Sequence, residues 1–222
     1  MTLRKLEIQE NLQIVNSRIG LAAKTCGRDP SEITLIVVTK TFPTSDIEAL
    51  YQLGIRNFGE NRDQEGSVKS PELPDDCIWH FQGQIQSNKL KSIANWADVV
   101  HSIDDLSHAS KLSSLVDQKD IFIQLSLDDQ PNRGGVDPEN LEEFVSGILA
   151  LKNLNLRGAM AVAPLGQEPG AAFARLKELS NQLQKFHPKA HEISAGMSND
   201  FESAIAHGAT HIRIGSQILG VR

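Results

Sequence analysis

The chain has 222 residues, and its 22 Lys and Arg against 28 Asp and Glu give a formal net charge of −6. Apolar residues make up 40% and charged residues 23%, which is typical of a globular protein, and the mildly acidic balance argues against nucleic-acid binding. No apolar run is long enough for a membrane span, and the first residues lack the pattern of a secretory signal.

The first segment has the spacing of an amphipathic helix, because Ile8, Leu12, Val15 and Ile19 recur on one face. This helix is predicted to end near 26–27, before a loop. Eight apolar runs follow, each of strand length and bounded by turn residues. The predicted strands are 33–38, 55–58, 78–81, 98–102, 121–125, 156–162, 191–194 and 211–214.

Helix signals separate these strands. The segment 45–48 has the spacing of a capping box, Ser102-x-x-Asp105 is expected to cap the next helix, and Asp137-Pro138 supplies an N-cap and a proline at the first helical position. Ser198 is expected to cap a helix that ends at Gly208. The predicted helices cover 45–54, a segment from about 60, 87–95, segments opening near 102 and 137, the stretch 173–183, and 198–208.

Eight strands that alternate with helices imply parallel pairing and right-handed crossovers. This count favours an α/β fold with a single (β/α)8 TIM barrel, spanning residues 1–222 as one domain with an extra N-terminal helix. A doubly wound open sheet is the alternative, but no Gly-x-Gly-x-x-Gly follows the first strand and the spacing is even. In a barrel, the reactive groups lie at the C-terminal ends of the strands.

Lys40 follows the first predicted strand. A lysine at the rim of a packed barrel can lose its proton and form a Schiff base with a carbonyl compound. Alternatively, Lys40 reaches solvent or pairs with a carboxylate such as Glu60. The residue types alone leave the two interpretations balanced.

The ends of the seventh and eighth strands carry the more specific signal. Gly196 and Gly215 allow a close approach of the backbone to an anion, and Ser194, Ser198 and Ser216 offer hydroxyl donors. Barrels often bind phosphate with these two loops. The alternative is two ordinary turns with a capping serine, but the coincidence of both loops favours a phosphate site.

Other rim residues allow two interpretations each. Arg213 either donates to a ring nitrogen or anion inside the barrel or lies outside in solvent, and Asn61 is either a rim donor or an N-cap. His80, between aromatic residues, is expected to be a core histidine, and Met160 to pack or line a ring. Arg133 lies in a turn and could contact an anion. No His, Cys or carboxylate spacing predicts a metal site.

A lysine after the first strand and a phosphate site after the last two point to pyridoxal phosphate. Five motifs then resemble the YggS/PROSC family of pyridoxal phosphate homeostasis proteins, including its cyanobacterial members, in order and spacing over essentially the whole chain. These motifs are Val38-Thr39-Lys40, Phe58-Gly59-Glu60-Asn61, Trp79-His80-Phe81-x-Gly83-x-x-Gln86-x-Asn88-Lys89, Gly196-Met197-Ser198-x-Asp200 and Arg213-Ile214-Gly215-Ser216.

The resemblance implies a barrel of the alanine racemase N-terminal type, with pyridoxal 5'-phosphate held as a Schiff base on Lys40. It implies that Arg213 faces the pyridine nitrogen and that Asn61 and Met160 lie against the cofactor. The phosphate-binding residues that it implies are Ser194, Met197, Ser198, Gly215 and Ser216. The chain departs from the family pattern at Gln82, Gln84, 132–134 and Ala195.

Three functions are weighed: a non-catalytic protein of pyridoxal phosphate homeostasis, a weakly active amino-acid racemase or decarboxylase, and a sugar-phosphate enzyme with a Schiff-base lysine. Related racemases take a tyrosine acid/base from a second domain, whereas this chain ends at Arg222 and its one tyrosine, Tyr51, has the setting of a packing residue. Arginine beside the pyridine nitrogen also makes the ring a poorer electron sink. These features favour the non-catalytic protein, with no catalytic residues.

Cellular setting and partners follow from the same features. The two cysteines, Cys26 and Cys77, lack Cys-x-x-Cys spacing, so we expect a reduced, cytoplasmic protein. The family resemblance suggests a monomer, with transient contacts to pyridoxal phosphate enzymes or regulatory proteins and none with nucleic acid or membranes.

Overall fold

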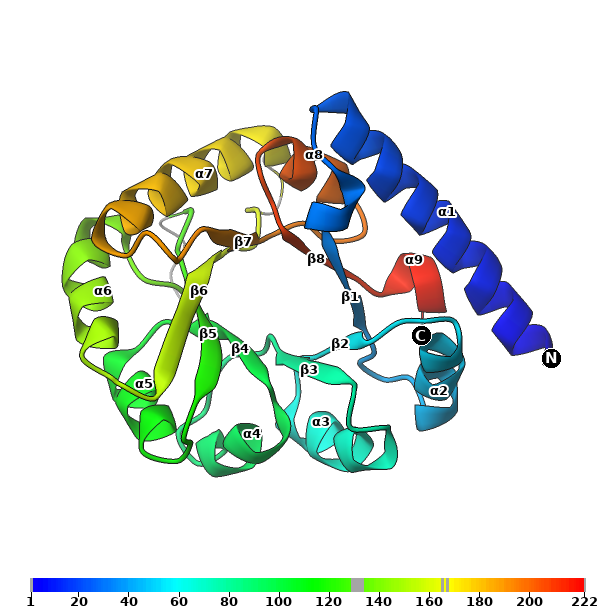
Figure 1. Cartoon of the computed structure of the whole chain (residues 1–222), viewed down its shortest axis with the longest axis horizontal. Coiled ribbons are helices and arrows are strands. Elements are labelled where there is room, and N and C mark those ends of the chain that lie inside the picture. The colour runs from blue at the N-terminus through cyan, green and yellow to red at the C-terminus, as the bar shows by residue number, and fades with distance from the viewer. Residues whose placement is uncertain (1, 129–133, 165, 167, 222) are drawn as a thin grey trace.

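The computed structural model describes residues 2–128, 134–164, 166 and 168–221. Its strands form a closed parallel barrel in chain order, from β1 to β8, and β1 pairs with β8 to close it. Figure 1 shows the helices in a ring outside the strands. The strands are β1 Thr34–Val38, β2 Asn57–Glu60, β3 Ile78–Phe81, β4 Val99–Ile103, β5 Lys119–Gln124, β6 Leu154–Met160, β7 Glu192–Ser194 and β8 His211–Ile214. The predicted TIM barrel is therefore confirmed.

The helices follow the strands as the sequence predicts, with an additional helix before the barrel. The α-helices are α1 Leu3–Thr25, α2 Thr44–Gln52, α3 Asp63–Lys69, α4 Leu90–Trp96, α5 Leu106–Ser113, α6 Leu141–Leu149, α7 Pro169–Phe186, α8 Phe201–Ala206 and α9 Ser216–Leu219. Short 3-10 turns lie at Pro30–Glu32, Ser70–Glu72 and Pro138–Asn140. Among the described residues, every helix is too short or too polar to cross a membrane.

Two apolar regions stabilise the barrel. The larger one lies between the strands and the outer helices, and it includes Val37, Phe58 and Ile212 together with the inner faces of the helices. A smaller cluster of Val99, Phe122 and Met160 lies apart from it. The alternation of strand side chains between two faces separates these regions, because successive residues point to opposite sides of a sheet.

Helix α1 covers the outside of the barrel near its closure, where it packs against α2, α8 and α9 (Figure 1). Its buried face is the one that the sequence predicts, and it carries Ile8, Leu12, Val15 and Ile19. The periodicity of apolar residues therefore identified both the helix and the side that faces the core.

Three predicted helix caps are wrong. Helix α2 begins directly after Pro43 without a side-chain cap, so Ser45 lies inside its first turn. Ser102 belongs to β4 and donates to the carbonyl of Gly83, whereas Asp105 is the N-cap of α5. Helix α8 begins at Phe201, and Ser198 lies in the turn before it. In each case a nearby polar residue or proline begins the helix instead, since several residues in one loop can serve as a cap.

Burial of α1 predicts a clear difference between two isoleucines of the same helix. Ile8 is fully buried, so Ile8→Ala is expected to lower the free energy of unfolding by about 2–5 kcal/mol through lost packing and a residual cavity. Ile14 is 60% exposed, and Ile14→Ala is expected to change it by no more than about 0.5 kcal/mol. Urea unfolding of both variants measures this, and equal losses would contradict the packing of α1.

Candidate functional site

A cavity of 530 Å³ opens among the segments that follow β1, β6, β7 and β8. It therefore lies at the C-terminal ends of the strands, where the sequence places the reactive groups. Six of the nine predicted site residues line it, from segments far apart in the chain. These residues are Lys40, Met197, Ser198, Arg213, Gly215 and Ser216.

Lys40 occupies an exposed position in the turn after β1, at the edge of this cavity. Within the described part of the chain, its amine makes no ion pair or hydrogen bond. The alternative in which Glu60 pairs with Lys40 is not observed, because Glu60 Oε1 lies 2.7 Å from the Nζ of Lys69. Lys40 is thus a cation of the cavity rather than a partner of the buried carboxylate.

The segments after β7 and β8 meet at one side of the cavity. The hydroxyl of Ser216 donates to that of Ser198 over 3.1 Å, so two hydroxyl groups from different loops lie side by side. Gly215 packs against β1, where a Cβ would lie 2.9 Å from the carbonyl oxygen of Val38. Only glycine allows this approach, which brings the start of α9 to the turn that carries Lys40.

Met197 and Asp200, which share one of the motifs identified in the sequence, are joined by a hydrogen bond at the cavity. The backbone N–H of Met197 donates to Asp200 Oδ1 over 2.5 Å, and both residues line the cavity. Gly196 has a φ of +92°, in the region that favours glycine, which turns the chain sharply after β7. The carboxylate of Asp200 therefore fixes the loop and adds one negative charge at the rim.

Arg213 points into the barrel, which resolves the alternative that the sequence left open. Its side chain is 5% exposed, and it donates from Nη1 to the hydroxyl of Ser194 over 2.8 Å and from Nη2 to the carbonyl of Ala161 over 3.0 Å. Burial lowers the pKa of the guanidinium to about 10, and Asp200 opposes that shift. Arg213 consequently stays charged at neutral pH.

A chain of hydrogen bonds continues from Arg213 through the barrel interior. His101 Nδ1 lies 2.9 Å from the Ser194 hydroxyl, His101 Nε2 lies 2.9 Å from His80 Nδ1, and His80 Nε2 lies 3.0 Å from Asn57 Oδ1. Because Arg213 only donates and Asn57 Oδ1 only accepts, the bonds can all run in one direction. Each neutral imidazole then donates from Nε2 and accepts at Nδ1.

Burial keeps these imidazoles neutral. It lowers the pKa of His80 to about 3 and that of His101 well below its usual value, with smaller contributions from neighbouring cationic or imidazole groups. The pKa of His211, whose ring lies 6.3 Å from that of His101, is lowered to about 4 for the same reason. His80 is therefore a core histidine, as predicted, while His101 was missed because its partners lie on other strands.

The remaining three predicted residues lie near the cavity but do not line it. Ser194 is fully buried beneath it as the partner of Arg213, and Met160 packs against Val99 and Phe122. Asn61 faces a neighbouring cavity of 590 Å³, beside Arg62 and Lys89. Arg133, which the sequence suggests as an anion contact, lies outside the described residues.

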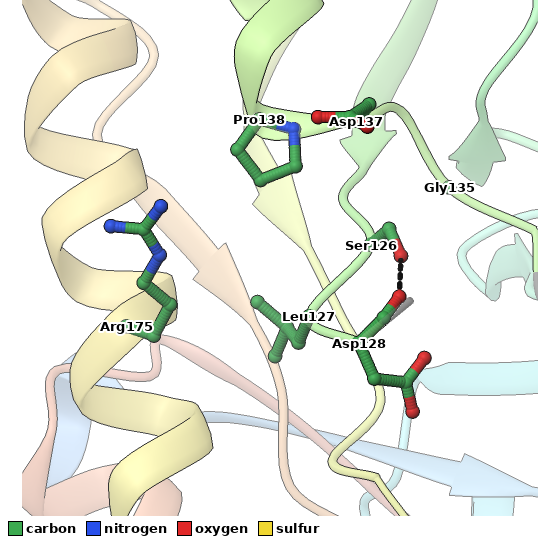
Figure 2. A pocket seen from close by; sticks show the side chains of 7 residues that line it. All are labelled: Ser126, Leu127, Asp128, Gly135, Asp137, Pro138 and Arg175. Carbon is green, nitrogen blue, oxygen red and sulfur yellow. Dashed lines mark hydrogen bonds between the residues drawn. The ribbon is translucent and has the colours of Figure 1, made fainter. Parts of the chain in front are cut away.

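A third cavity, of 380 Å³, lies beyond the end of β5 and is lined by none of the nine predicted residues. Figure 2 shows Arg175 extending from α7 on one side, with Asp128 and the Asp137–Pro138 corner around it. The hydroxyl of Ser126 donates to the carbonyl of Asp128 over 2.6 Å. Over the described residues, no group of three or more His, Cys, Asp or Glu is arranged to hold a metal ion.

Comparison with known proteins gives consistent matches over almost the whole chain. The family model of the alanine racemase N-terminal domain matches residues 8–222. The pyridoxal phosphate homeostasis protein of Mycobacterium leprae is 37% identical over 98% of this chain and 93% of its own length. That of Pseudomonas aeruginosa is 39% identical over 97% of this chain and 96% of its own length.

Solved structures give the same result. The structure of PipY from Synechococcus elongatus PCC7942 with PLP bound is 34% identical to this chain, with a TM-score of 0.85. The match covers 96% of this chain and 100% of that chain.

The buried imidazoles predict a dependence of stability on pH. Their pKa values are lower in the folded protein than the ordinary value of 6.5, so below about pH 6.5 the unfolded chain binds protons that the folded chain does not. As the pH falls, each such group lowers the free energy of unfolding by up to about 1.4 kcal/mol per pH unit. His80→Gln is expected to reduce this slope by about that amount between about pH 6 and pH 4.

Urea unfolding over this pH range measures the effect. The exposed His191 provides the matched control, and His191→Gln is expected to leave the slope as it is in the unmodified chain. An unchanged slope for the His80 variant would argue against a neutral, buried His80.

Proposed function

The chain belongs to the alanine racemase N-terminal domain family and to its pyridoxal phosphate homeostasis proteins, and we propose that it binds pyridoxal 5'-phosphate in intracellular vitamin B6 homeostasis. In this proposal residues 1–222 act as one domain that holds the cofactor as a Schiff base on Lys40 and turns over no substrate. The charge of the cavity beside Lys40 is the observation that carries it.

Charge distinguishes this cavity from the two others. Among the described residues that line it, Lys40 and Arg213 are cations and Asp200 is the single carboxylate. The cavity beside Asn61 has two cations and two carboxylates, and the one in Figure 2 has one arginine and two carboxylates. A phosphate group carries negative charge, so it is attracted most strongly to the cavity that contains Lys40.

The donors in this cavity suit a phosphate group and an aromatic ring. We assign the phosphate to the hydroxyl groups of Ser198 and Ser216 and to the backbone of Gly215, with Met197 beside it and its N–H donating to Asp200. Ser194 supports Arg213 from below. The volume of 530 Å³ lies in the range of small-molecule sites. The residues present therefore fit pyridoxal phosphate, with Asn61 and Met160 assigned to its surroundings.

Lys40 supplies the covalent link. Pyridoxal phosphate would supply an aldehyde, with which a lysine amine can condense with loss of water, and Lys40 would be the residue that holds it. The Lys40 amine lies at the cavity edge without an ion pair among the described residues, so no carboxylate there blocks its approach to a bound aldehyde.

Two features favour holding the cofactor over turning over a substrate. Arg213 is a permanent donor at neutral pH, so a ring nitrogen that accepts from it stays unprotonated and withdraws electrons weakly. Tyr51, the one tyrosine of the sequence, lies in the region that precedes β2. The guanidinium carbon of Arg56 lies 3.9 Å from the centre of the Tyr51 ring. That region is at the opposite end of the strands from the cavity.

The cellular setting is part of the same proposal. Cys26 and Cys77 are both free thiols, which supports a reduced cytoplasmic environment. We propose a monomer that contacts pyridoxal phosphate enzymes or regulatory proteins transiently.

The covalent link is tested by reduction of the loaded protein. Purified protein with pyridoxal phosphate is expected to be yellow, and borohydride should attach the cofactor irreversibly to Lys40, as peptide mass spectrometry would report. Lys40→Ala should abolish both the colour and the attachment. Lys91→Ala, at an exposed lysine of α4, is the control that should keep both. Attachment to another lysine would contradict the proposal.

Absence of turnover is tested separately. With saturating pyridoxal phosphate, the protein is expected to show no saturable racemisation or decarboxylation of free amino acids. The described lining of the cavity contains no tyrosine, and the cofactor's ring would withdraw electrons weakly beside Arg213. Chiral chromatography and carbon dioxide release measure the two reactions. Saturable turnover would favour a racemase or decarboxylase, and borohydride trapping of a triose phosphate would favour the sugar-phosphate enzyme.

A further inference from the structure

Lys69, the last residue of α3, lies beneath the turn that carries Lys40. Its side chain is buried, and its Nζ donates to the carbonyl of Thr39 over 2.9 Å, to Glu60 Oε1 over 2.7 Å and to Glu65 Oε2 over 2.7 Å. An ammonium group has three donors and no acceptor. Every donor of Lys69 therefore has a partner, and the side chain is held in one position.

The residues around Lys69 form hydrogen bonds with the residues on both sides of Lys40. On one side, the Thr39 hydroxyl donates to Glu60 Oε1 over 2.5 Å, and the Thr39 N–H donates to the carbonyl of Gly59 over 2.9 Å. On the other side, the N–H of Thr41 donates to Glu65 Oε2 over 2.6 Å. Lys40 is thus the centre of a three-residue turn that is bound at both neighbours.

Thr41 shows that this turn needs support. Its φ is +67°, and it is the one non-glycine residue with positive φ in the described part of the chain. A β-branched residue is strained there, and such a conformation persists when the surrounding contacts enforce it. The hydrogen bond to Glu65, which Lys69 holds in place, is one of those contacts.

Charge gives Lys69 a second effect. Glu60 is fully buried, and burial raises the pKa of its carboxyl while Lys69 and Thr39 oppose that shift. The hydrogen bonds from Lys69 and Thr41 lower the pKa of Glu65 despite the opposing effect of burial. Both carboxylates touch the Lys40 turn, and both have Lys69 as their close cation. Arg62 also faces Glu65, over 4.0 Å, so without Lys69 it is Glu60 for which Lys40 would become the available cation.

We propose that Lys69 is a positioning residue for Lys40: it fixes the Thr39–Thr41 turn, and it occupies Glu60 and Glu65 so that the Lys40 amine stays unpaired in the cavity. This inference rests on the proposed role of Lys40 in holding pyridoxal phosphate. Lys69 itself is not among the residues that line the cavity. It acts through the backbone of Thr39 and through the two carboxylates.

Two variants separate the two effects. Lys69→Met leaves Glu60 without a cation, whereas Glu65 keeps Arg62 at 4.0 Å. Lys40 is therefore expected to pair with Glu60 and to react about tenfold more slowly with an amine-acylating reagent. The double variant Glu60→Gln with Lys69→Met removes the buried charge together with its partner, so we expect it to fold. It should restore most of the Lys40 reactivity but leave the turn loose.

Looseness of the turn is read in the cofactor-free protein by hydrogen exchange at the Thr41 amide. We expect this exchange to be about tenfold faster in the double variant, and pyridoxal phosphate to leave the double variant several times faster than the unmodified protein. Lys69→Arg keeps the charge and the donors and should rescue all three measurements. Lys185→Met, at an exposed lysine in the last turn of α7, is the matched control and should change none of them.

Two results together would overturn the proposal. In the double variant, labelling, exchange and cofactor dissociation would all stay within twofold of the unmodified protein, and in Lys69→Met the labelling of Lys40 would be unchanged. If Lys69→Met does not fold, the charge-neutral double variant carries the test alone. A failure of the proposed function is distinct, because pyridoxal phosphate would then not attach to Lys40 of the unmodified protein, while labelling and exchange need no cofactor.

Discussion

Pairing of β1 with β8 is the constraint on which the site depends. It aligns Val37 with Ile214 in adjacent parallel strands, so the segments that leave them, with Lys40 and Ser216, emerge side by side although they are far apart in the sequence. Gly215 is required at this junction because a side chain there would meet the Val38 carbonyl. Closure of the barrel therefore brings the candidate lysine to the hydroxyl groups that we assign to the phosphate, although the two loops are distant in the sequence.

The polar interior of the barrel stabilises a charge that the site needs. A guanidinium is costly to bury without partners, and Arg213 has two of them in Ser194 and the Ala161 carbonyl. The imidazoles beneath stay neutral, so they satisfy Ser194 without adding a second positive charge close to Arg213. A protonated His101 would repel the guanidinium. Burial thus lowers the pKa of the imidazoles and of Arg213 alike, and Arg213 stays charged at neutral pH because a guanidinium begins from a much higher pKa.

The sequence predicted the elements and the end of the barrel where the cavity lies, because apolar periodicity and parallel connection are local or topological properties. It placed helix starts at Ser45, Ser102 and Ser198 wrongly, since several polar residues in one loop can cap a helix and packing selects among them. It left the direction of Arg213 open, and it missed His101 and Lys69 altogether. His101 contacts Ser194, 93 positions away, and Lys69 contacts the carbonyl of Thr39, 30 positions away; no local pattern encodes either contact.

Two lysines near the end of β1 illustrate how the fold assigns different tasks to one residue type. Lys69 meets three acceptors in a buried position, where an unpaired ammonium would be costly, so its side chain is held in one place. Lys40 lies in an exposed turn, and its neighbours Thr39 and Thr41 take up the nearby acceptors and donors through their own backbone and hydroxyl groups. The carboxylates of Glu60 and Glu65, which the fold brings close to Lys40, therefore stabilise the turn. What remains for the Lys40 amine is the cavity, and that is the arrangement that covalent capture of an aldehyde requires.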